Sequence, residues 1–183
     1  MGDSFKIIAI TRPDFFEDEV KMIIDILKQG RTDIIHLRKP GSNSKDIENL
    51  IEKIPEEYHP RLKIHDHFEL TEKFKLAGIH LNSRNPVVSG NPMSVSRSMH
   101  SIEELKGAAR YDYVTLSPIF DSISKKGYKA AFNHDMLRNV LKERRNVIAL
   151  GGVTPEKYQF LKELGFYGAA LLSHFFNGED HRN

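Results

Sequence analysis

Two adjacent glycines stand where an apolar run meets a helix-forming segment, in NVIALGGVTPEK at residues 146–157. Gly151 and Gly152 remove two side chains from this turn, and Pro155 suits the first turn of the helix that follows. Backbone N–H groups at such a turn can bind a phosphate, and Ser173, one unit later, adds an amide and a hydroxyl. The alternative is a tight turn that needs only positive φ angles. We interpret the glycines as a phosphate-binding loop.

Charged side chains stand at the ends of two earlier apolar runs. Arg38 follows DIIHL, and Asp66 follows LKIH. In barrel enzymes the groups that do chemistry lie at the carboxyl ends of strands, where this cation and this carboxylate are predicted. The alternatives are a surface ion pair for Arg38 and a helix N-cap for Asp66. We favour a site role for both.

Three of the nine histidines fall on successive strand candidates. His36, His65 and His80 lie on faces that could converge inside a sheet. Such imidazoles could bind zinc, act as acid and base near neutral pH, or only line a pocket with hydrogen bonds. No closely spaced pair of the HxxxH type occurs, which argues against a metal cluster. We therefore favour proton transfer by His36 or His65.

The stretch SISKKG, residues 122–127, is polar and lies between a strand and a helix. One interpretation is a loop that is simply solvated. The other is a lid that places Lys125 or Lys126 on a phosphate.

Strand-like and helix-like patterns alternate along the whole chain. Helical segments carry apolar residues at i, i+3, i+4 and i+7, as in Val20, Ile23, Ile24 and Leu27. Alternating units predict a parallel sheet, and eight of them favour a closed (β/α)₈ TIM barrel over a doubly wound sheet. We expect one compact domain over residues 1–183, with reduced helices after the fourth and eighth strands. The strand candidates are 6–11, 33–39, 62–66, 78–82, 93–98, 113–118, 147–152 and 168–173.

Composition excludes several classes of function. A formal net charge of +2 gives no argument for nucleic acid or an acidic membrane surface as a partner. The absence of cysteine excludes disulfides, thiolate chemistry and Cys-ligated zinc. The apolar run at the N-terminus is too short for a signal peptide or a membrane span. We expect a cytoplasmic protein with small-molecule substrates, and a homo-oligomer is compatible with this.

Several segments, in order along nearly the whole chain, resemble thiamine phosphate synthase and its relative TenI, the thiazole tautomerase. The segments are IIHLRKP, LKIHDHFELTEKFKLAGIHLNSRN, SRSMHSIEEL, DYVTLSPIFDSISKKGY, VIALGGVTPEK and GAALLS. The resemblance implies a (β/α)₈ barrel, in agreement with the alternation of elements. It also implies phosphorylated thiazole and pyrimidine substrates: the synthase joins a hydroxymethylpyrimidine diphosphate to thiazole phosphate and releases pyrophosphate with the help of Mg²⁺.

By this resemblance, Arg38 would hold the diphosphate, and Asp66 would bind the magnesium ion with Asn85 beside it. Ser98 would face the diphosphate. The phosphate contacts implied along the later strands and loops are Ser122, Ser124, Lys125, Gly152 and Ser173.

The sequence also departs from the synthase pattern around the diphosphate. His36 replaces a Gln, Pro40 a Lys, His65 an Asn, and Asn85 a second magnesium-binding Asp. The tautomerase pattern is also incomplete, because its catalytic His aligns with Pro118. The synthase is our first expectation. A tautomerase using a His or Asp66 as base, or a non-catalytic binder of thiazole or thiamine phosphate, remains the alternative.

Overall fold

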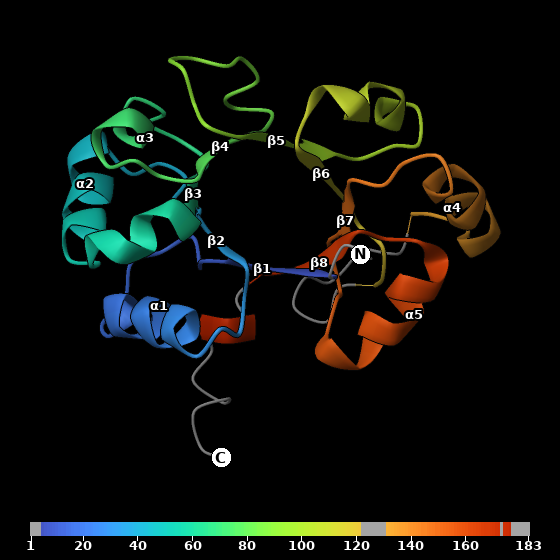
Figure 1. Ribbon diagram of the computed structural model, residues 1–183, viewed down its shortest axis with the longest axis horizontal. Coiled ribbons are helices and arrows are strands. Elements are labelled where there is room, and N and C mark those ends of the chain that lie inside the picture. The colour runs from blue at the N-terminus through green and yellow to red at the C-terminus, as the bar shows by residue number, and fades with distance from the viewer. Residues whose placement is uncertain (1–4, 122–130, 173, 177–183) are drawn as a thin grey trace. The chain divides into compact units, whose positions relative to one another are not determined.

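The computed structural model describes residues 5–121, 131–172 and 174–176. Eight parallel strands pair in chain order into a closed barrel (Figure 1), which confirms the predicted (β/α)₈ fold. The strands are β1 (Lys6–Ile10), β2 (Ile34–Leu37), β3 (Leu62–Ile64), β4 (Gly78–Leu81), β5 (Val95–Met99), β6 (Tyr113–Leu116), β7 (Val147–Ala149) and β8 (Gly168–Leu172).

Five α-helices lie between strands in the described ranges: α1 (Glu19–Lys28), α2 (Ser44–Glu52), α3 (Leu70–Lys73), α4 (His134–Leu141) and α5 (Tyr158–Leu164). Short 3₁₀ helices cover Glu56–Arg61, Glu104–Arg110, Pro155–Lys157 and His174–Phe176. No helix follows β4 over residues 82–94, and a 3₁₀ turn of three residues follows β8. Both reduced connections were predicted. None of the helices in the described ranges is long and apolar enough to cross a bilayer.

Two further connections contain little α-helix. The helix after β3 has only four residues, and it lies between His67 and Lys75, which both have positive φ angles. The segment after β5 begins with a turn like a capping box, in which Glu104 N–H donates to Ser101 Oγ and His100 N–H donates to Glu104 Oε2. It continues as a 3₁₀ helix that contains Gly107, a poor helix former.

Residue contacts divide the chain into two compact units. The N-terminal unit comprises Ile8–Val95 with the turn His174–Phe176, and the C-terminal unit comprises Ser96–Leu171 with residues 5–7. The boundaries fall inside β1, β5 and β8 and not in a linker. We therefore propose that both units belong to one barrel domain.

Strand register explains which side chains reach the interior of the N-terminal unit. Ile10, His36 and Lys63 are in register on β1, β2 and β3, so their side chains share one face of the sheet. Ile35 and Leu37 alternate with His36 and are buried on the opposite face, which the helices cover. Polar and apolar side chains are thus separated on the two faces of β2.

The rotation of α1 differs from the prediction. Its buried face consists of Glu19, Met22, Ile23, Ile26 and Leu27, whereas Val20 and Ile24 are half-buried. Glu19 points inward because it forms an ion pair with Lys39, 2.5 Å apart. The buried ion pair of Glu19, in the first turn of α1, therefore determines which face of the helix packs against the core.

Candidate functional site

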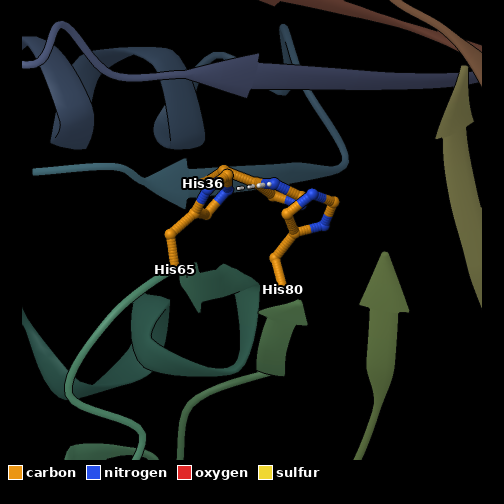
Figure 2. A group of neighbouring side chains, drawn as sticks. All are labelled: His36, His65 and His80. Carbon is orange, nitrogen blue, oxygen red and sulfur yellow. Dashed lines mark hydrogen bonds between the residues drawn. The ribbon is translucent and has the colours of Figure 1, made fainter. Parts of the chain in front are cut away.

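Three histidines from neighbouring strands meet inside the N-terminal unit. His36 lies on β2, His65 directly follows β3, and His80 lies on β4 (Figure 2). All three are buried, and Nδ1 of His36 lies 2.9 Å from Nε2 of His65. This is a hydrogen bond in which one imidazole donates to the other. The convergence expected from the strand positions is therefore present.

Burial is the main reason why these imidazoles have lowered pKa values. The pKa values of His36 and His65 lie well below the ordinary 6.5, and His80 is the next cause in both cases. The pKa of His80 is lowered to about 3 by burial and then by the positive charge of Lys63. The three side chains are therefore neutral at pH 7, and the hydrogen-bonded pair of His36 and His65 can relay a proton by exchange of tautomers.

The arrangement of the rings fits a hydrogen-bonded group better than a metal site. The candidate ligand nitrogens all lie within 4.8 Å of one another. However, the rings of His65 and His80 are stacked, with centroids 4.4 Å apart and planes 28° apart. Lone pairs lie in the plane of an imidazole, so two stacked rings do not direct them toward one point, as a shared ion requires. The sequence argument against a metal cluster is consistent with this geometry.

Asp66 lies beside this group and contacts two side chains of the loop after β4. Arg84 Nη2 lies 3.3 Å from Oδ1 and 3.4 Å from Oδ2 of Asp66. Asn85 Nδ2 donates to Oδ1 of Asp66 at 2.7 Å and to the carbonyl of His65 at 3.1 Å. Asp66 is therefore not the cap of α3. Asn85 presents its amide nitrogen, not its oxygen, to the carboxylate.

Arg38 directly follows β2 and is half-buried. Its backbone N–H donates to Thr11 Oγ1 at 3.0 Å, which holds the strand end against β1. Burial lowers the pKa of its guanidinium, the charge of Arg84 lowers it further, and Asp66 opposes both effects. Arg38, Asp66 and Arg84 therefore interact electrostatically. Sequence reasoning overlooked Arg84, although it precedes Asn85 in the segment that resembles the family.

Lys39 does not join this group, although it is adjacent to Arg38 in sequence. Its side chain is buried and donates to Glu19 Oε1 at 2.5 Å, to the Asp14 carbonyl at 2.7 Å and to the Arg12 carbonyl at 3.0 Å. It cannot supply the positive charge that the lysine missing at position 40 would have given.

The glycine loop of the C-terminal unit, residues 150–153, packs closely against the segment that follows β6. Gly151 and Gly152 have φ angles of +91° and +61°. A Cβ on Gly151 would lie 2.9 Å from Cα of Pro118, and one on Gly152 would collide with the carbonyl oxygen of Asp121. Close approach of the segment after β6 is therefore a sufficient reason for both glycines. A phosphate-binding role stays a prediction.

We expect Gly152→Ala to destabilise the protein by roughly 2–4 kcal/mol without any ligand, from the left-handed backbone and the collision with Asp121 together. Urea denaturation would measure this change. Gly107→Ala is the matched control, because a Cβ there meets nothing within 4 Å and the φ angle is not positive. Equal stability of Gly152→Ala and wild type would contradict the packing explanation.

The other predicted site residues are placed only in part. Ser98 is half-buried on β5, in register with Thr115 of β6. Ser122, Ser124, Lys125 and Ser173 lie outside the described residues. Their assignment rests on the sequence resemblance alone.

The fold and the polar groups at its strand ends define a (β/α)₈ barrel of the kind that carries its chemistry at the carboxyl ends of the strands. The sequence matches the thiamine monophosphate synthase family over residues 7–175. The chain belongs to this family.

Individual relatives agree with the family match. The thiamine-phosphate synthase of Lactococcus lactis is 24% identical over 182 residues, covering 91% of this chain and 84% of the relative. That of Anoxybacillus flavithermus is 27% identical and covers 87% of this chain and 80% of its own length. A crystal structure of thiamine phosphate pyrophosphorylase from Bacteroides thetaiotaomicron is 38% identical, with a TM-score of 0.84, and covers 98% of this chain and 90% of that chain.

Proposed function

We propose that this protein is an enzyme of thiamine biosynthesis that joins a hydroxymethylpyrimidine diphosphate to a thiazole phosphate. A C–N bond forms to the thiazole nitrogen, the C–O bond to the diphosphate breaks, and pyrophosphate leaves. The observation that carries this proposal is family membership over nearly the whole chain, residues 7–175. The relatives named thiamine-phosphate synthase support the same reaction.

The diphosphate side of the reaction would rest on Arg38 and Asp66. Negative charge develops on the leaving oxygen, so a fixed positive charge held at that position lowers the barrier. Arg38 suits this role because its backbone is anchored to Thr11 and its guanidinium is partly desolvated. By the sequence resemblance, we also assign Ser98 and Lys125 to binding of the diphosphate.

A magnesium ion fits the group around Asp66 with one protein carboxylate. Mg²⁺ is commonly bound by one or two carboxylates, with substrate phosphates and water as the other ligands. Asp66 would hold it, and Asn85 could join only through its side-chain oxygen. The ion would neutralise charge on the departing diphosphate.

The thiazole phosphate would bind at Gly151 and Gly152, with Ser173. Within the described part of the chain, the N–H groups of the two glycines donate to no other group. Lys157 lies beside this loop, where it donates to the Gly152 carbonyl, with its Nζ 4.3 Å from the ring centroid of Phe120. Available amides and a nearby ammonium favour an anion.

A turnover assay with both substrates and Mg²⁺, following pyrophosphate release, tests the proposal. We expect release that requires both substrates and falls about 100-fold or more in Arg38→Ala, as for loss of one oxyanion-binding donor. Arg138→Ala, which removes an exposed arginine of α4, is the control. Absence of release by the wild type would count against the synthase.

A tautomerase acting on thiazole phosphate is the second candidate. It is favoured by the neutral His36–His65 pair next to Asp66, because such a pair can carry a proton between atoms of a substrate. The protein would then exchange a thiazole phosphate proton in D₂O without any diphosphate, and His65→Gln would abolish the exchange. If the protein bound thiazole phosphate but gave no turnover in either assay, a non-catalytic binder would be favoured.

A further inference from the structure

Asp66 contacts two residues of the loop after β4, Arg84 and Asn85, next to the proposed diphosphate site. Arg84 reaches both carboxylate oxygens at 3.3 and 3.4 Å, longer than the 2.7–2.9 Å typical of a strong charge-assisted hydrogen bond. The Arg84 side chain is 43% exposed, whereas that of Asp66 is 15% exposed. A ligand arriving from solvent therefore meets the guanidinium first, and exposed ion pairs of this kind are weak and easily exchanged.

The balance of charge in this group favours an anion. Arg38 and Arg84 carry two positive charges against the single carboxylate of Asp66, because position 85 is an amide. The mutual repulsion of the two guanidinium groups is one cause of the lowered pKa of Arg38. A group with an excess of positive charge at a strand end is stabilised when a polyanion binds.

Three other cations of the N-terminal unit already have polar partners. Lys39 is buried with Glu19. Lys63 is fully buried and donates to Ser94 Oγ at 2.8 Å. Arg12 forms an ion pair with Asp14 at 2.7 Å. Among the described residues, Arg84 is the exposed cation whose side chain contacts Asp66.

We propose that Arg84 binds the diphosphate of the substrate and exchanges its ion pair with Asp66 for this contact. This inference rests on the proposed function, because it assumes a diphosphate substrate. The exchange frees the Asp66 carboxylate at the moment the diphosphate arrives. Before that, Arg84 competes with a magnesium ion for the same oxygens, so the diphosphate and the metal bind together.

Calorimetric binding of inorganic pyrophosphate, with and without Mg²⁺, tests this role separately from turnover. We expect Arg84→Ala to bind pyrophosphate roughly 10- to 100-fold more weakly without Mg²⁺, the usual effect of losing a hydrogen bond between charged groups. Arg138→Ala should bind like the wild type, because this arginine also pairs with an aspartate, Asp135, but lies on α4. Arg84→Gln replaces Arg84→Ala if the alanine variant does not fold.

A second variant separates direct binding from an indirect effect on the fold. Asp66→Asn frees Arg84 and should keep metal-free pyrophosphate binding, while losing the gain in affinity that Mg²⁺ gives the wild type. Equal affinity of Arg84→Ala and wild type would overturn the role of Arg84 and leave the proposed function standing. An equal loss of metal-free pyrophosphate affinity in Asp66→Asn and Arg84→Ala would also overturn the role of Arg84. Absence of pyrophosphate binding by the wild type, with or without Mg²⁺, would overturn both.

Discussion

Lowering the pH from 7 to 5 is expected to remove at most about 6 kcal/mol of folding stability, because three histidines are buried in neutral form. The pKa values of His36, His65 and His80 are lowered from 6.5 in the folded state. Well above pH 6.5 neither the folded nor the unfolded state is protonated at these histidines, so their stabilising contribution is complete. Below pH 6.5 the unfolded chain binds protons at these histidines and the folded chain does not. The resulting loss of folding stability is about 2 kcal/mol per histidine at pH 5.

Urea denaturation at several pH values between 5 and 7.5 would measure this loss. His36→Gln should reduce it by about one third, since one protonation step disappears. His134→Gln is the control, because His134 is exposed on α4. Glu19 opposes the trend, since burial raises the pKa of its carboxyl group. Equal stability at pH 7 and pH 5 would show that the folded protein accepts charge on the three histidines.

Replacing Lys39 by methionine is expected to destabilise the protein by about 3–5 kcal/mol, the usual result of removing one partner of a buried ion pair. The side chains of Lys39 and Glu19 are 0% and 2% exposed. Without the ammonium, the Glu19 carboxylate would be buried without its ion-pair partner, and the Arg12 and Asp14 carbonyls would lose a donor.

The double variant Lys39→Met/Glu19→Leu is the matched control for this prediction. It removes both charges, so it should recover most of the lost stability. Chemical denaturation of the wild type, both single variants and the double variant would give the coupling energy. If Lys39→Met instead kept its stability and lost only turnover, Lys39 would belong to the substrate site.

The sequence predicted the features that depend on periodicity. Alternation on β2 and the order of the strands were enough to predict that His36, His65 and His80 meet, because neighbouring parallel strands bring polar residues to one face. The hydrogen bond from Glu104 N–H to Ser101 Oγ also follows from local spacing alone, because Ser-x-x-Glu is the sequence pattern of a capping box.

The features that were not predicted depend on contacts between distant segments. Lys39 and Glu19 are 20 residues apart. Their ion pair buries the lysine away from Arg38 and determines the rotation of α1. Arg84 and Asp66 are 18 residues apart, and no spacing rule connects them. An apolar pattern likewise does not reveal a left-handed residue such as Lys75, which follows the short helix after β3.

The loop after β6 and the glycine loop after β7 share backbone hydrogen bonds: Ile119 N–H donates to the Leu150 carbonyl and Phe120 N–H to the Gly151 carbonyl, both at 3.0 Å. Residues 119–120 are therefore tied to the glycine loop through the backbone. We expect a ligand that displaces the glycine loop to displace residues 119–120 with it, and by thermodynamic reciprocity a ligand bound at residues 119–120 would change the affinity of the glycine loop by the same factor.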